Sequence, residues 1–228
     1  MCPSPVKPGG RRGYLMPIGG AEDKGNDPRI LGRFLEICGG EKARIVVIPT
    51  ASRLPDTGAM YTDLFMDLGA DRALFTDINE RSDCDDETLL EEMDAATGIF
   101  VTGGNQLRLS GILGGTPVGQ RLRRLNADGI PIAGTSAGAA MMSQHMIVGG
   151  ASGNSPREDG VNLAPGIGLI NTAIIDQHFS QRDRLGRLLT ALSYNPFLIG
   201  VGVDEDTAFL IDGDNKGQVV GNGVVTIL

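Results

Sequence analysis

The fold of this chain is set by one segment, Ile130-Pro131-Ile132-Ala133-Gly134-Thr135-Ser136-Ala137-Gly138-Ala139-Ala140. An apolar strand runs into the pattern Gly-x-Ser-x-Gly, which is followed by the small-residue start of a helix. Such a strand-to-helix turn is a nucleophile elbow, in which a serine hydroxyl is exposed at the end of a strand. Ser136 is therefore the candidate nucleophile, and the backbone N–H of Ala137 is a candidate donor to an oxyanion. A purely structural glycine-rich turn is the alternative interpretation.

On both sides of this segment, short apolar runs alternate with amphipathic stretches. The pattern predicts strands at Tyr14–Ile18, Ala43–Ile48, Arg72–Phe75, Gly98–Val101 and Ile130–Ala133, and helices near 27–38, 57–68, 85–95, 105–125 and 136–147. Strands that alternate with helices form βαβ units, in which helices cover both faces of a parallel sheet. We therefore expect a three-layer α/β/α sandwich with a mainly parallel sheet.

The C-terminal part of the chain has a different pattern. It predicts a strand at Ala173–Ile175, a helix near 180–193, and then strands at Leu198–Val203, Thr207–Ile211, Gln218–Val220 and Val224–Ile227. Short turns rich in Asp, Asn and Gly separate the last four strands, which indicates antiparallel hairpins within one mixed sheet. Because no linker or repeat interrupts the pattern, we expect a single catalytic domain over residues 13–228, preceded by a flexible tail over residues 1–12.

Composition excludes several classes of protein. The 228 residues are 41% hydrophobic and carry a net charge of −8, so nucleic acid is not expected as a partner. No apolar run approaches the roughly 18 residues of a membrane helix, and the first residues lack the apolar segment of a secretory signal. The three cysteines, Cys2, Cys38 and Cys84, lack metal-ligand spacing and indicate free thiols in the cytoplasm. Neither a metal nor a nucleotide cofactor is predicted.

A serine nucleophile needs a base, and the chain has only two histidines. On the predicted helix, His145 would face away from Ser136, about 13 Å further along the axis. His178, at the end of a predicted strand, is therefore the expected base. The third member should be a carboxylate that orients the imidazole. The candidates are Asp176, Asp204, Glu205 and Asp206, and at this point both Asp176 and Glu205 stay open.

Two further motifs belong at the same end of the sheet. The turn Thr102-Gly103-Gly104-Asn105-Gln106 follows a strand, and the backbone N–H of Gly104 is a candidate for the second oxyanion donor. Arg182, Arg184 and Arg187 follow His178 and are suited to bind substrate carboxylates, with a solvated helix face as the alternative. By contrast, Pro17-Ile18-Gly19-Gly20 is expected to be an ordinary tight turn.

Taken together and in order, four of these motifs resemble the cyanophycinase family. They are Gly134-Thr135-Ser136-Ala137-Gly138-Ala139, Thr102-Gly103-Gly104-Asn105-Gln106, Asp176-Gln177-His178-Phe179-Ser180-Gln181-Arg182-x-Arg184-x-x-Arg187 and Asp204-Glu205-Asp206-Thr207-Ala208. The resemblance implies a serine exopeptidase with a fold like that of class I glutamine amidotransferases. It implies the triad Ser136, His178 and Glu205. It also implies substrate-binding roles for Gln106, Asp176, Gln177, Arg182, Arg184 and Arg187.

The substrate implied by the resemblance is cyanophycin, a polyaspartate backbone with arginine on each β-carboxylate, or short aspartyl-arginine peptides. Members release β-Asp-Arg dipeptides and are usually homodimers. One alternative is an aspartyl or isoaspartyl dipeptidase of the same type. Another is an ester-cleaving α/β-hydrolase, although its usual order of nucleophile, acid and histidine does not suit Glu205. The third is a catalytically silent binding protein on an amidotransferase-like scaffold.

Overall fold

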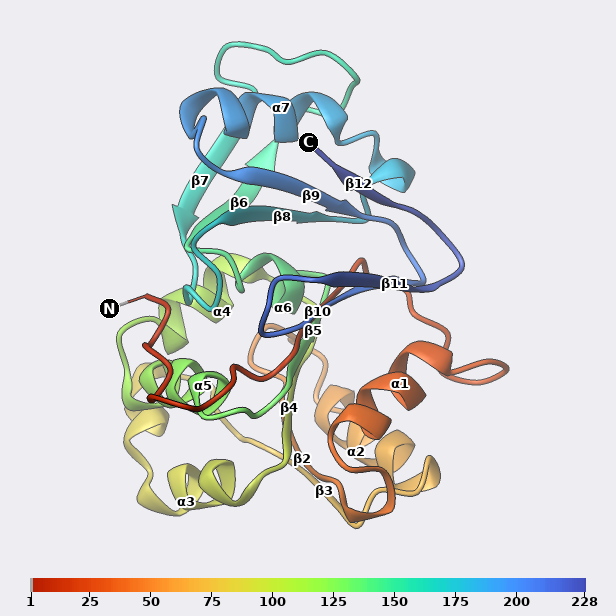
Figure 1. Cartoon of the computed structure of the whole chain (residues 1–228), viewed down its shortest axis with the longest axis vertical. Helices are drawn as coiled ribbons and strands as arrows, with labels where there is room; N and C mark the ends of the chain where they lie inside the picture. Colours follow the sequence, from red (N-terminus) through yellow and green to blue (C-terminus); the bar gives the residue numbers. More distant parts are fainter. Residues whose placement is uncertain (1) are drawn as a thin grey trace.

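The computed structural model describes residues 2–228, and its centre is a seven-stranded sheet in the order β11-β10-β1-β5-β4-β2-β3 (Figure 1). The strands are β1 (Leu15–Ile18), β2 (Arg44–Ile48), β3 (Arg72–Phe75), β4 (Gly98–Val101), β5 (Ile132–Thr135), β10 (Thr207–Ile211) and β11 (Gly217–Gly221). The first five are mutually parallel, whereas β10 and β11 extend the sheet as an antiparallel hairpin. Aliphatic residues buried on both faces explain the parallel part of the sheet.

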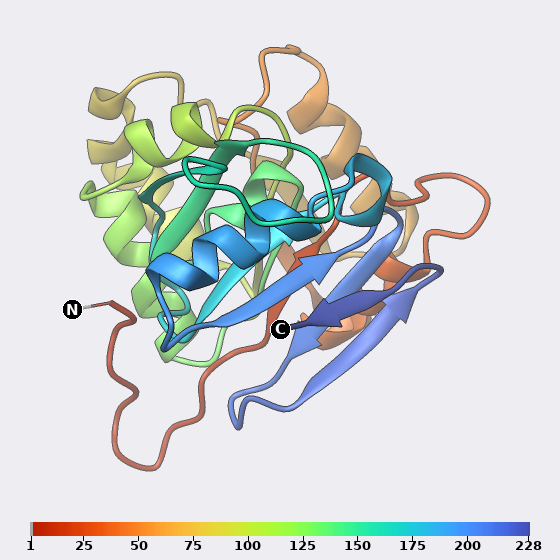
Figure 2. The same ribbon diagram turned by 90° about the horizontal axis from the view of Figure 1, so that it is seen from above.

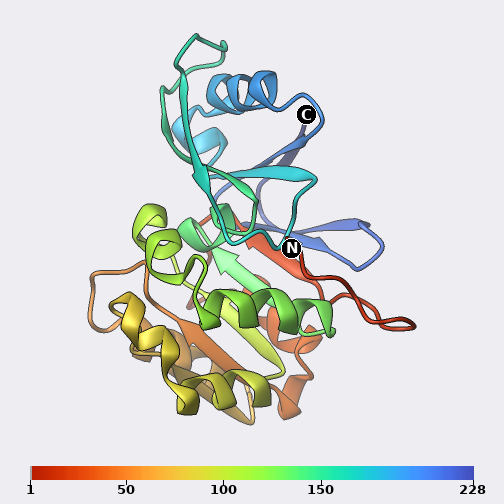
Figure 3. The ribbon, with the colours of Figure 1, turned by 90° about the vertical axis from the view of Figure 1, so that its left-hand side faces the viewer.

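Helices cover both faces of this sheet. The helices α1 (Arg29–Ile37) and α2 (Thr57–Asp67) cover one face, and α3 (Glu87–Ala95), α4 (Gln106–Leu113) and α5 (Pro117–Ala127) cover the other (Figures 1 and 3). Each face has its own apolar core. Phe34, Phe65 and Phe100 pack together in one of them, with ring centroids 5.3–5.8 Å apart. The predicted three-layer α/β/α sandwich is therefore confirmed.

A smaller unit lies at the carboxyl ends of the parallel strands of the main sheet, and it was not predicted as a separate layer. It consists of a three-stranded sheet, β12 (Val225–Ile227), β9 (Ile199–Val203) and β8 (Ala173–Gln177), and of the pair β6 (His145–Gly150) and β7 (Val161–Pro165). The helix α7 (Leu185–Tyr194) lies across its strands (Figure 2). Within residues 2–228, we find no helix with the length and apolar character needed to cross a bilayer.

The predicted helix over residues 136–147 is wrong. The helix α6 covers only Ala137–Ala140, and the exposed His145 begins strand β6. The chain leaves the helix because residues distant in sequence take its next carbonyl groups. The N–H of Ile167 donates to the Met141 carbonyl, and the N–H groups of residues 169 and 170 donate to the Met142 carbonyl. Similarly, the stretch 105–125 is two helices, because Gly114 and Gly115 separate α4 from α5.

The predicted single mixed sheet of C-terminal hairpins is also wrong in part. Only β10 and β11 form the expected hairpin, whereas β9 pairs in parallel with β8 and antiparallel with β12. The chain changes sheets between β9 and β10. Asp204 holds this crossing, since its carboxylate accepts hydrogen bonds from the N–H groups of Ser180 and Val224. This crossing places the segment after β9 beside the turn that follows β1, where the N–H of Asp206 donates to the Gly20 carbonyl at 2.9 Å.

Residues 2–12 contain no helix or strand, yet they contact the rest of the chain. Arg11 forms ion pairs with Asp212 and Asp214 in the β10–β11 turn. Arg12 donates a hydrogen bond of 3.2 Å to the Asn126 side chain on α5. The segment therefore links the turn of the hairpin to α5.

Candidate active site

The turn at Ser136 has the geometry of a nucleophile elbow. Ser136 has φ 52° and ψ −108°, a conformation that is unfavourable for a residue other than glycine. A Cβ atom at Gly134 would lie 2.4 Å from the carbonyl oxygen of Gly138, and one at Gly138 would lie 2.3 Å from that of Val101. Both glycines are therefore needed for the strand, the turn and α6 to pack against β4.

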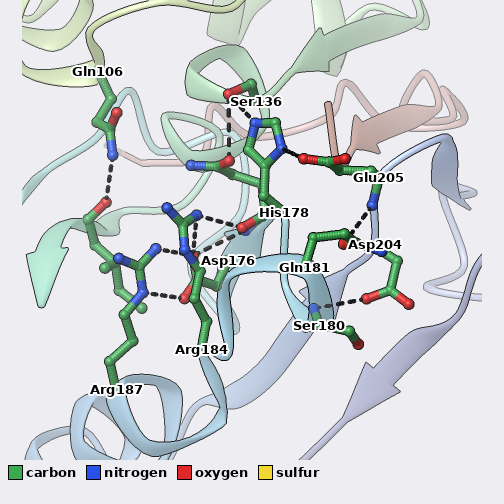
Figure 4. Close-up of polar contacts among 12 residues, drawn as sticks. Gln106, Ser136, Asp176, His178, Ser180, Gln181, Arg184, Arg187, Asp204 and Glu205 are labelled. Atoms are coloured by element: carbon green, nitrogen blue, oxygen red, sulfur yellow. Dashed lines mark hydrogen bonds and ion pairs between the residues drawn. The ribbon is translucent and has the colours of Figure 1, made fainter. Parts of the chain in front are cut away.

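Ser136, His178 and Glu205 form one hydrogen-bonded row (Figure 4). The Oγ of Ser136 lies 3.0 Å from Nε2 of His178, and Nδ1 of His178 lies 2.5 Å from Oε1 of Glu205. A hydroxyl, an imidazole and a carboxylate in this order are the arrangement of nucleophile, base and orienting acid. The row joins the main sheet, which carries Ser136, to the small sheet, which carries His178.

The turn after β1 holds the imidazole in place. The N–H of His178 donates to the Gly19 carbonyl at 2.8 Å. Gly20 has φ 98°, and a Cβ atom there would lie 2.4 Å from Cε1 of His178. Pro17–Gly20 was expected to be an ordinary turn, and that expectation missed that the turn packs against the imidazole of His178. Two successive glycines at the end of a buried strand were the available signal.

The environment of His178 favours the neutral imidazole. Burial lowers the pKa of His178 below its ordinary value, and the positive charges of Arg182 and Arg184 lower it further. The hydrogen bond and the charge of Glu205 raise this pKa without cancelling the burial effect. Near neutral pH the ring is therefore unprotonated, as required for a group that accepts the proton of Ser136.

Asp176, the rival of Glu205, is committed to other partners. Its side chain is buried and accepts a hydrogen bond of 2.6 Å from Nε of Arg187, and Nη2 of Arg187 lies 2.5 Å from its other oxygen. Arg184 approaches the same carboxylate at 3.5 Å and also donates to the Gln177 carbonyl. Burial lowers the pKa of Arg184 to about 10. The geometry thus leaves Glu205 as the carboxylate that meets the imidazole.

The other candidate substrate-binding residues surround this row at different depths. Oε1 of Gln177 lies 3.3 Å from Oγ of Ser136. Gln106, at the start of α4, donates to the Ile147 carbonyl at 3.3 Å, and Arg182 is exposed beside His178. In contrast, Arg184 and Arg187 are buried and paired. The expected arginine cluster therefore divides into one exposed guanidinium and two buried ones.

The glycine-rich turn after β4 adjoins the nucleophile. A Cβ atom at Gly103 would lie 3.2 Å from Cβ of Ser136. Gly104 has φ 143°, and a Cβ atom there would lie 2.1 Å from the Ala51 carbonyl oxygen. Only glycine fits at Gly104, because the backbone of Ala51 lies against it, and Gly103 is the residue that brings this turn beside Ser136.

Glu22 is a buried charge that the sequence did not reveal. Its side chain is 1% exposed and accepts hydrogen bonds from Oγ1 of Thr135 at 2.6 Å and from the hydroxyl of Tyr61, while Nζ of Lys24 lies 3.0 Å away. Burial and the charge of Glu22 raise the pKa of Tyr61, which stays a hydrogen-bond donor. Glu22 thereby anchors the residue that precedes Ser136.

Comparison with protein families and curated proteins gives a consistent picture. The model of peptidase family S51 matches residues 15–219. A cyanophycinase from Trichormus variabilis is 44% identical over 216 residues, which cover 94% of this chain and 72% of the relative. A cyanophycinase from Geminocystis herdmanii is 44% identical over 219 residues, covering 95% of this chain and 80% of the relative.

Two solved structures share the fold. A peptidase from an acI-B1 actinobacterium is 24% identical with a TM-score of 0.74, and the match covers 96% of this chain and 92% of that one. A structure described as a putative peptidase E protein from Listeria monocytogenes is 19% identical with a TM-score of 0.63, covering 93% of this chain and all of that one.

Proposed function

Because this chain belongs to peptidase family S51, we propose that it is a cyanophycinase, a serine-type exopeptidase that releases β-Asp-Arg dipeptides from cyanophycin. The observation that carries the proposal is the row of Ser136, His178 and Glu205, which supplies the groups needed for acyl transfer. The curated relatives that are named cyanophycinase support the choice of substrate.

In the proposed reaction, His178 accepts the proton of Ser136 as Oγ attacks the scissile carbonyl carbon. The N–H groups of Ala137 and Gly104 stabilise the oxyanion, and Glu205 stabilises the imidazolium. As the C–N bond breaks, His178 gives its proton to the leaving amine of the dipeptide. A water molecule, deprotonated by His178, then attacks the acyl carbon and restores the hydroxyl of Ser136.

The charges around the row suit a substrate whose repeating unit carries both signs. Each unit of cyanophycin ends in a free α-carboxylate and a guanidinium. Arg182 is exposed and available to a substrate carboxylate, whereas the buried pair of Asp176 and Arg187 shapes the wall behind it. We assign Gln177, Gln106 and Arg184 to the same substrate-binding wall.

We also propose that residues 13–228 act as one catalytic domain, and that the enzyme works as a homodimer in the cytoplasm. Cys38 and Cys84 are buried free thiols, which suits a reducing compartment. Sedimentation of the purified protein at several concentrations tests the dimer. A single species with the mass of one chain would contradict it.

The deciding experiment compares the wild-type protein with Ser136→Ala on insoluble cyanophycin granules. Wild type should clear the granules and release β-Asp-Arg, and the variant should lose about 10⁴-fold or more of kcat. Ser110→Ala is the matched control, because within residues 2–228 the Ser110 hydroxyl forms a hydrogen bond only with the Leu107 carbonyl on α4. A panel with α-Asp and β-Asp dipeptides separates a cyanophycinase from a dipeptidase, which would cleave the short peptides and spare the polymer.

A further inference from the structure

A cavity apart from the row of Ser136, His178 and Glu205 opens at the carboxyl ends of β2 and β3, the same end of the parallel strands that carries Ser136. It has a volume of about 590 Å³ and is separate from the row of catalytic groups. The residues of its wall that matter here are Thr50, Arg53, Phe75, Thr76, Asp77 and Arg108. The reaction as derived above uses none of them, although the wall carries charges of both signs.

The positive charge of the cavity is held by the backbone. Arg108 reaches from α4, and its Nε donates to the Thr50 carbonyl at 2.8 Å while its Nη2 donates to the Asn79 carbonyl at 3.2 Å. Within residues 2–228, no carboxylate pairs with Arg108 or with the exposed Arg53. A guanidinium that is oriented by carbonyl groups and lacks a counter-charge is prepared to bind an anionic ligand group.

The negative charge lies on the other side of Asn79. The side-chain amide of Asn79 donates to Asp77 at 2.7 Å, and no cation of the described chain pairs with Asp77. In the wall between these charges, the hydroxyls of Thr50 and Thr76 are buried and have no hydrogen-bond partner within residues 2–228. Both oxygens are covered by protein atoms, so they make the wall polar without offering direct contacts to a ligand.

The position of the cavity relates it to Ser136. In the sheet order, β2 lies two strands and β3 three strands from β5, so with a strand spacing of about 4.8 Å the cavity begins about 10–14 Å away. The loop after β2, which lines the cavity, contacts the turn after β4, which adjoins Ser136: the N–H of Asn105 donates to the Ala51 carbonyl at 2.9 Å. On the opposite side of Ser136, Gly20 and the imidazole of His178 fill the space.

We propose that this cavity binds an arginyl arm of the polymer, three or four units before the bond that is cleaved. The inference rests on the proposed function. The α-carboxylate of the arm meets Arg108 and Arg53, its guanidinium meets Asp77, and its methylene groups lie on the half-exposed ring of Phe75. An extended backbone advances about 3.3–3.6 Å per residue, so three or four units span the distance from Ser136.

The test is the dependence of hydrolysis on chain length in Asp77→Asn and, separately, Arg53→Gln. Substrates are β-Asp-Arg oligomers of two units and of six units. With six units, each variant should raise KM about fivefold with kcat unchanged, and with two units both constants should match wild type. Asp71→Asn is the matched control, because Asp71 is exposed and precedes the opposite end of the same strand.

The outcomes separate this inference from the proposed function. If wild type hydrolyses both oligomers and the variants behave alike on the two lengths, the cavity is not a subsite and the cyanophycinase assignment stands. If wild type releases no dipeptide from either oligomer, the proposed function fails and the inference fails with it. Binding of the six-unit oligomer to Ser136→Ala, with and without Asp77→Asn, measures the same contact without turnover and should weaken by the same factor.

Discussion

Adding one methyl group at Gly20 should disable the enzyme while leaving it folded. The new Cβ of Gly20→Ala would lie 2.4 Å from Cε1 of His178. Ordinary contact begins near 3.4 Å, so the imidazole must retreat by about 1 Å. That displacement acts directly on the 3.0 Å contact between Nε2 and Oγ of Ser136.

A misplacement of about 1 Å in a reacting pair costs about 10²-fold in rate, which corresponds to about 2.7 kcal/mol of transition-state stabilisation. The variant should also be less stable, because an alanine at φ 98° lowers the free energy of unfolding by about 1–2 kcal/mol. The expected result is a loss of about 10²-fold in kcat with a modest fall in the unfolding midpoint.

Gly69→Ala isolates the effect on the imidazole from the backbone strain. Gly69 has φ 101°, close to that of Gly20, and a Cβ atom there meets nothing within 4 Å. Steady-state hydrolysis of a β-Asp-Arg oligomer and urea unfolding are measured on both variants. Both should lose similar stability, and only Gly20→Ala should lose kcat. Wild-type kcat in a folded Gly20→Ala protein would refute the account of how His178 is held.

Two other variants probe the charges around the site. Since the charge of Arg182 lowers the pKa of His178, and activity needs the neutral ring, wild-type kcat/KM should fall with decreasing pH only below the ordinary histidine pKa. In Arg182→Gln this acidic limb should move to higher pH, and an unmoved limb would contradict the charge effect. Asp176→Asn leaves Arg187 buried without its counter-charge, so unfolding in urea should show a loss of about 3–5 kcal/mol, and an unchanged midpoint would contradict this burial argument.

Several parts of the fold can be predicted from the sequence because the patterns that indicate them are local. The strands at Arg72–Phe75, Gly98–Val101 and Thr207–Ile211 have the predicted bounds, since each is a short apolar run between polar residues or glycines. The elbow at Ser136 is also signalled locally, because its Gly-x-Ser-x-Gly pattern spans five consecutive residues between an apolar strand and a small-residue helix start. The choice of base was also narrowed by composition, since the chain has only two histidines.

Other parts depend on partners far away in the chain. The stretch after α6 has a helical pattern, yet it becomes β6 because residues 167–170 take the carbonyl groups that a continuing helix would use. Similarly, β9 has the pattern of a hairpin strand, and nothing within it indicates that β8 rather than β10 is its neighbour. Sequence periodicity describes one strand at a time and is silent about which strand lies beside it.

The candidate site divides along the same line. Taken alone, the sequence determined the sandwich and the serine at the elbow, because these follow from local patterns. It excluded His145 as the base by placing it on a helix, whereas the structure places His145 at the start of β6 and brings His178 to Ser136. The choice between Asp176 and Glu205 belongs to the tertiary structure, as do the roles of Gly20 and Glu22. Two buried arginines approach Asp176, and the crossing after β9 brings Glu205, 27 residues beyond His178, to its imidazole. The carboxylate that contacts the His178 imidazole is decided by where the chain crosses between the two sheets, and the spacing of residues along the sequence does not predict that crossing.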